Sequence, residues 1–80
     1  MKETNAIEYF TRRRPDSGPM RIIYSRIIRA LGLRNIATMD QLCEMSLKEL
    51  IVMRGIGEKA RAVILDECRN YRDESIEGRT

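Results

Sequence analysis

The sequence predicts an all-α protein, and three observations lead to this prediction. Apolar residues recur at helical spacing along most of the chain. Two capping boxes, Thr38 to Gln41 and Ser46 to Glu49, mark the starts of two short helices in succession. No stretch alternates apolar and polar residues as a strand does. We therefore expect a compact single domain of about four helices: one longer N-terminal helix, two short helices, and a long final helix that follows a hairpin.

Length and composition restrict the class of protein further. Eighty residues make at most one small domain. With 42% hydrophobic and 34% charged residues, the chain is typical of a globular domain rather than a disordered one. It has no run of about 18 apolar residues and no signal-peptide pattern, so we expect a soluble, cytoplasmic protein that does not enter a membrane.

Residues 1–19 are expected to form a flexible basic arm. The segment from Pro15 to Pro19 contains two prolines, a glycine and a serine, and this composition breaks regular structure. We expect at most a brief helical turn near Ile7. The run Arg12 to Arg14 is a candidate for contact with a phosphate backbone or a minor groove, and a solvated charge run is the alternative.

Residues 20–73 are expected to form the helical domain, beginning with a helix over 21–31 that Gly32 ends as its C-terminal cap. Two short helices should follow at the capping boxes, and the last helix should run over 58–72. Residues 74–80 are expected to form a frayed polar tail. The apolar positions of these four helices predict the core. They are Ile23, Ile27, Ala30 and Leu31; Met39, Leu42 and Cys43; Leu47, Leu50, Ile51 and Met53; and Ala60, Val63, Ile64, Cys68 and Tyr71, with Leu33 and Ile36 in a connector.

The hairpin, residues 53–60, carries the strongest functional signal. Gly55 and Gly57 flank Ile56 between two helices, and glycine permits a tight turn there. Ile56 should point inward. Gly57 should leave the first amides of the next helix uncovered, and such amides favour an anion such as phosphate. A plain connecting turn without a ligand is the alternative.

Little in the chain suggests catalysis. There is no histidine, and Cys43 and Cys68 lie in apolar segments, where small buried thiols are expected rather than a disulfide or a metal site. Asp40 and Glu44 have the spacing that would let them share a metal ion. We expect them instead to be solvated on a helix surface. No P-loop, zinc spacing or nucleophile elbow occurs. We expect no enzyme activity, no metal and no cofactor.

Several positively charged residues lie in or near the hairpin. This distribution favours a binding protein over an enzyme. Arginines dominate between Arg12 and Arg34, where Asp16 is the one acidic residue, and acids are more frequent from Asp66 onward. Surface solubility is the alternative explanation of these charges. The candidate DNA-binding residues are Arg26, Arg29, Arg54, Gly55, Gly57 and Lys59.

The stretch from Arg26 to Thr38, then Leu42, Ser46, Glu49-Leu50 and Gly55 to Ala60, resembles the C-terminal domain of the bacterial RNA polymerase alpha subunit. The likeness runs from about residue 23 to 71 without gaps, and the hairpin also resembles the helix-hairpin-helix class. It implies that Arg26 enters a DNA minor groove while the hairpin, with Gly57 and Lys59, holds phosphates.

Four positions depart from that family. Arg29 and Gly55 replace its usual asparagines, Ala60 replaces a serine, and Arg61 replaces an apolar residue. Backbone contacts through amides survive such changes. Because 80 residues leave no room for the subunit's assembly domain, we expect a free-standing relative from a bacterium, phage or mobile element. The expected function is binding of duplex DNA in transcription. The alternative is a module that docks on RNA polymerase or a transcription regulator.

Overall fold

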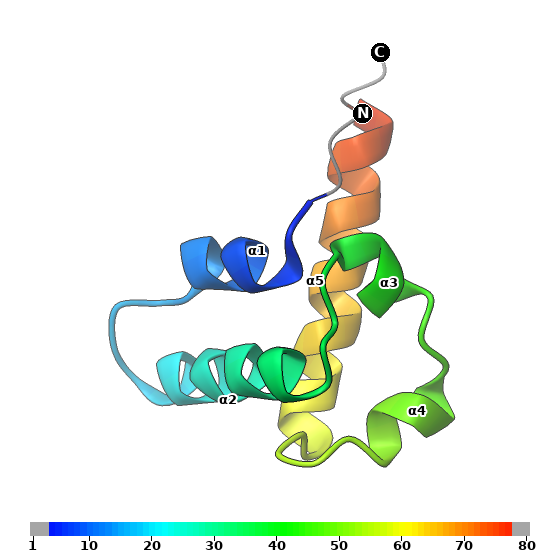
Figure 1. Ribbon diagram of the computed structural model, residues 1–80. Helices are drawn as coiled ribbons and strands as arrows, with labels where there is room; N and C mark the ends of the chain where they lie inside the picture. The colour runs from blue at the N-terminus through cyan, green and yellow to red at the C-terminus, as the bar shows by residue number, and fades with distance from the viewer. Residues whose placement is uncertain (1–3, 78–80) are drawn as a thin grey trace.

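Five helices form the part of the chain that the computed structural model describes, residues 4–77 (Figure 1). They are α1 (Ala6–Arg13), α2 (Pro19–Leu33), α3 (Met39–Cys43), α4 (Leu47–Ile51) and α5 (Glu58–Glu77). α1 and α2 lie on one side of α5, whereas α3 and α4 lie on the other. The radius of gyration is 12.2 Å, close to the value of about 12 Å expected for a compact chain of this length. The expected all-α single domain is confirmed.

The flexible arm expected over residues 1–19 is wrong for Ala6 to Arg13, which form α1. Asn5 caps this helix by accepting a hydrogen bond of 2.9 Å from the Glu8 amide. Ala6, Tyr9 and Phe10 share one face and are buried, with no exposed surface on Phe10. The helix is stable because this apolar face packs on the rest of the domain, although eight residues are too few for a helix that stands alone.

The backbone before α1 is tied to the connector between α2 and α3. The Ala6 amide donates to the Ala37 carbonyl at 2.9 Å, and the Met39 amide donates to the Thr4 carbonyl at 2.9 Å. These two bonds flank an isolated antiparallel bridge between Asn5 and Thr38. The segment that was expected to be a mobile arm is therefore held at its beginning as well as along its buried face.

α2 extends beyond the expected range of 21–31 at both ends. It begins at Pro19, because proline suits the first position of a helix, where no amide partner is needed. Gly32 was expected to end the helix but lies inside it, near Ile7. The left-handed turn falls instead on Asn35, with φ of +57°, a conformation that asparagine tolerates better than most residues. Ile36 then packs into the core as expected.

The two capping boxes place α3 and α4 where the sequence indicates. Ser46 and Glu49 form the complete reciprocal box. Thr38 accepts a hydrogen bond from the Gln41 amide at 3.1 Å, but the Gln41 side chain accepts from the Ala37 amide rather than from Thr38. The second half of the box is thus shifted by one residue, and the helix still begins at Met39.

Most of the predicted core is buried, four of its residues are partly buried and three are exposed. The partly buried residues are Ile23, Cys43, Val63 and Tyr71. Leu33, Leu47 and Ile51 are 71%, 55% and 52% exposed. A helix of five residues such as α4 has only one narrow inward face, and Leu50 occupies it. Met53, just after the helix, is buried as expected.

α5 is longer than expected, because it continues through the start of the segment assigned to a polar tail. The helix ends at Glu77, whereas residue 72 was expected, and residues 78–80 of that tail lie outside the described residues. Arg13 reaches Glu74 with 3.7 Å between its Nη1 atom and Oε1, which helps to hold this extra turn. The apolar stripe of α5 is confirmed, since Ala60, Ile64 and Cys68 are buried.

Candidate nucleic-acid interface

The hairpin turns tightly between α4 and α5 and is anchored by two buried side chains. Met53 and Ile56 are 2% and 6% exposed, so Ile56 points inward as expected. The Ile56 amide donates to the Met53 carbonyl at 3.3 Å and closes the turn. Gly55 has φ of +85°, in the left-handed region that a residue with a side chain rarely adopts. The turn therefore requires a glycine at Gly55.

Gly57 has a different role from Gly55, because its backbone is not left-handed and a Cβ atom there would meet open space. Its carbonyl accepts the first helical hydrogen bond of α5, from the Arg61 amide at 2.9 Å. Gly57 is thus the residue that caps α5, and it has no side chain to cover the amides behind it. Within residues 4–77, nothing accepts a hydrogen bond from the amides of Glu58, Lys59 or Ala60.

The six candidate DNA-binding residues belong to two groups. Arg54, Gly55, Gly57 and Lys59 are adjacent in the hairpin and exposed. Arg26 and Arg29 are exposed on α2, whose opposite side packs into the core through Ile27 and Leu31. Ile27 and Ile56 belong to the same apolar cluster, so the core joins the two groups. Within residues 4–77, no side-chain hydrogen bond joins the two groups directly.

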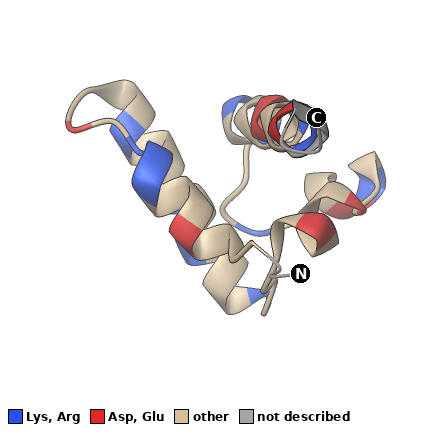
Figure 2. Cartoon of the chain, turned by 90° about the horizontal axis from the view of Figure 1, so that it is seen from above, with Lys and Arg blue, Asp and Glu red and all other residues tan. Residues whose placement is uncertain are grey.

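The charge of α2 has one sign, whereas the other long helix carries both. α2 contains three arginines and no acidic residue. In Figure 2, the paired helices α1 and α2 carry mostly blue segments and one red segment, whereas α5, which is seen end-on, carries both red and blue. The exposed side of α2 is therefore the surface best suited to a polyanion.

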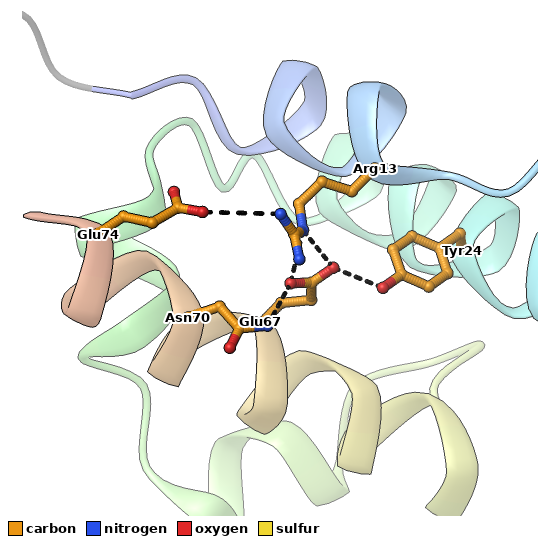
Figure 3. A network of polar contacts seen from close by, with 5 residues as sticks. All are labelled: Arg13, Tyr24, Glu67, Asn70 and Glu74. Atoms are coloured by element: carbon orange, nitrogen blue, oxygen red, sulfur yellow. Dashed lines mark hydrogen bonds and ion pairs between the residues drawn. The ribbon is translucent and has the colours of Figure 1, made fainter.

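The arginine run Arg12 to Arg14 does not form a free basic arm. Arg13 is bound to the buried Glu67, although its own side chain is 38% exposed. Its Nε atom donates to both oxygens of Glu67 at 2.7 Å (Figure 3). Its guanidinium also lies 5.4 Å from the centre of the Tyr9 ring. Arg14 donates to the Ser25 hydroxyl at 3.4 Å, and Arg12 is exposed. Two of these three candidate arginines are thus bound by groups of the domain itself.

Glu67 is the centre of a buried polar network between α1, α2 and α5. It is 2% exposed and accepts hydrogen bonds from Arg13, from the Tyr24 hydroxyl and from the Asn70 amide at 3.1 Å (Figure 3). Burial by itself would raise the pKa of Glu67, but the hydrogen bonds from Arg13, Tyr24 and Asn70 lower that pKa below its ordinary value. Burial and the bond to Glu67 raise the pKa of Tyr24. The network is structural, since it joins residues of three helices.

An exposed apolar component of the surface was missed by the sequence reasoning. Ile22 and Leu33 are 57% and 71% exposed. They lie on the same face of α2 as Arg26 and Arg29, since successive members of this set are four, three and four residues apart. The helical spacing places Ile22 with the arginines. The exposure of Leu33 was missed because Leu33 was assigned to a connector that packs on the core, whereas it is the last residue of α2.

Comparisons with known proteins leave the chain unassigned: no family model, no curated protein and no solved structure matches it. The residues that the structure describes contain no group of three or more His, Cys, Asp or Glu side chains placed to hold a metal ion. None of their helices has both the length and the apolar character to cross a membrane.

Proposed function

We propose that this protein binds duplex DNA through the hairpin and the exposed side of α2. The observation that carries the proposal is the hairpin itself, in which Gly57 leaves three amides at the start of α5 without a partner within residues 4–77. Such amides, together with the helix dipole, favour a phosphate oxygen. Lys59 and Arg54 are exposed next to them and supply positive charge.

α2 provides the second contact of the proposed complex. Arg26 and Arg29 are exposed on a helix without acidic residues, so this helix would attract the DNA backbone and direct Arg26 to the minor groove. The resemblance of residues 23–71 to the RNA polymerase alpha C-terminal domain supports the same assignment of roles. It also supports a place in bacterial or phage transcription. Arg13 and Arg14 take no part, because they are bound within the domain.

The test is a titration of a labelled, short A/T-rich duplex followed by fluorescence anisotropy. Arg26→Ala and Lys59→Ala should each weaken binding about tenfold at low salt, the loss expected for one charge-assisted contact. Both variants should keep the helical circular dichroism of the parent, since both side chains are exposed.

Arg69→Ala is the matched control, because Arg69 is an exposed arginine on α5 that faces Asp66 at 3.9 Å. It removes the same charge outside the proposed surface and should leave the affinity within about twofold, as expected for a screened, distant charge. Equal losses in all three variants would show a nonspecific charge effect. Full binding by Arg26→Ala and Lys59→Ala would refute the proposed interface.

The second candidate function is docking on a protein, such as RNA polymerase or a transcription regulator. It is favoured by Ile22 and Leu33, since exposed aliphatic side chains beside two arginines suit a protein surface with carboxylates better than they suit DNA. The two functions separate in a pull-down from nuclease-treated bacterial extract. Docking predicts that a polymerase component is retained and that Leu33→Ser loses it, whereas Leu33→Ser should bind DNA normally.

A further inference from the structure

Two thiols that are distant in the sequence lie together in a groove between α3, α4 and α5. Cys43 is the last residue of α3, and Cys68 lies in the middle of α5. Both line the same groove of about 530 Å³, whose apolar lining includes Leu50 and Ile64. Both side chains also belong to the same packing region: Cys68 is a member of the buried apolar cluster, and Cys43 packs against that cluster. Neither is in a disulfide, and Cys43 is the more exposed of the two.

The groove also brings a cation to the thiols. The Arg72 Nη2 atom donates to the Cys43 carbonyl at 2.9 Å, and Arg69, Arg72 and Asp73 are the charged residues that line the groove. Burial and the nearby Cys43 raise the pKa of Cys68 despite Arg72, so Cys68 is largely protonated at neutral pH. Cys43 is therefore the thiol that a dissolved reagent reaches first.

We propose that Cys43 and Cys68 form a reversible intramolecular disulfide by exchange with a small disulfide of the glutathione type. This inference rests on the groove and the thiol pair alone, and it does not depend on DNA binding.

The exchange balances in two steps. The Cys43 thiolate attacks one sulfur of oxidised glutathione, a Cys43–glutathione bond forms, and one glutathione thiolate leaves. Cys68 then loses its proton to solvent and attacks the Cys43 sulfur, which releases the second glutathione thiolate. The protein thiols are oxidised to the disulfide, and one oxidised glutathione is reduced to two thiols. The second step should become faster as the pH rises, because Cys68 must first ionise.

A disulfide between Cys43 and Cys68 would also have a structural effect. It would join α3 to α5 and close a loop that contains α4 and the hairpin. The bond requires the two Cβ atoms to lie about 4 Å apart. α3, a helix of five residues between two connectors, is the element that would move to reach this spacing. Because the cross-link restricts the unfolded chain, the oxidised protein should unfold at a higher temperature than the reduced one.

The test is incubation of the reduced full chain with oxidised glutathione, followed by alkylation of remaining thiols and intact-mass measurement. The expected product has lost two hydrogens, carries no alkyl group, keeps its helical circular dichroism and melts above the reduced form. Cys68→Ala should stop at the glutathione adduct on Cys43. Cys43→Ala should react at least tenfold more slowly, because Cys68 is buried.

Three results would overturn the proposal. The parent protein could keep both thiols, although the same chain oxidises in denaturant. It could accumulate as much of the glutathione adduct on Cys43 as the Cys68→Ala variant does. It could lose its helical signal as the bond forms, which would mean that only the unfolded chain reacts. None of these results bears on DNA binding, which is measured with the reduced protein.

Discussion

At the scale of single residues, the buried carboxylate of Glu67 holds three helices together. Its partners Arg13, Tyr24 and Asn70 come from α1, α2 and α5. Since a buried charge is costly without partners, these bonds keep the carboxylate ionised inside the protein. The network therefore fixes how α1 and α2 pack against α5, and its contribution should be seen when one partner is removed.

We expect Glu67→Gln to lower the free energy of unfolding by about 2–3 kcal/mol, because Arg13 loses its ion pair while it remains partly buried. Urea denaturation followed by circular dichroism measures this change. Asp66→Asn is the matched control, since Asp66 is exposed and its ion pair with Arg69 is long, at 3.9 Å. It should cost less than about 0.5 kcal/mol. Equal effects of the two variants would contradict the role of the network.

The same carboxylate predicts a dependence of stability on pH. The pKa of Glu67 is lowered on folding, so its contribution is fully present above the unfolded pKa, near 4.5, and is lost as the pH falls through the lower folded value. Thermal unfolding should therefore show a falling midpoint below about pH 4.5. Glu67→Gln should show a smaller fall than the parent over this range. A parallel fall in both proteins would assign the effect to other carboxylates.

At the scale of elements, α1 belongs to the core even though its last residues merge into an arginine run. Ala6 and Phe10 have no exposed surface, and the Phe10 ring is 5.8 Å from that of Tyr24. The sequence reasoning gave more weight to the prolines and glycine after residue 14 than to the apolar spacing before it. Those residues do break the helix, but they form the loop to α2 rather than a free arm.

Phe10→Ala should therefore lower the free energy of unfolding by about 3–5 kcal/mol, the usual cost of removing a buried aromatic ring. Arg12→Ala, an exposed change in the same helix, should cost less than about 0.5 kcal/mol. Both are measured by chemical denaturation. A flexible arm would make the two variants equally stable, so this comparison decides whether α1 is part of the folded domain in solution.

At the start of α5, one substitution should change the stability and the DNA affinity in opposite directions. Gly57→Ser adds a side chain that caps the helix, and it should raise the free energy of unfolding by a few tenths of a kcal/mol. The same hydroxyl would occupy an amide that we assign to phosphate, so DNA binding should weaken. Anisotropy and urea denaturation on one sample give both values. A variant that is more stable and binds equally well would exclude these amides from the interface.

At the scale of the whole molecule, the proposed interface consists of four cations on two elements, Arg26 and Arg29 from α2 and Arg54 and Lys59 from the hairpin. If all four contact phosphates, the logarithm of the association constant should fall with the logarithm of salt concentration with a slope of about −3 to −4. Lys59→Ala should reduce this slope by about one. A slope near zero would mean that phosphates are not the target, and would favour the docking function.

Several features of the fold and of the candidate site follow from local sequence. The capping boxes start α3 and α4 because a hydroxyl and an acid or amide three residues later bond to nearby amides. Ile56 and the stripe of α5 are buried at the expected positions. Gly55 occupies the left-handed turn, a conformation for which glycine is the usual choice. Each of these depends on neighbours within a few residues.

The remaining features needed the tertiary structure, because they depend on partners far along the chain. Arg13 is a structural residue only because Glu67 lies opposite it, 54 residues away. Leu33, Leu47 and Ile51 are apolar and were expected in the core, yet they are exposed, whereas Leu31 and Leu50 are buried. The sequence by itself determined the helical class, the hairpin and the caps, since local hydrogen bonds and periodicity set them. Which apolar faces are buried and which arginines stay available were decided by long-range packing.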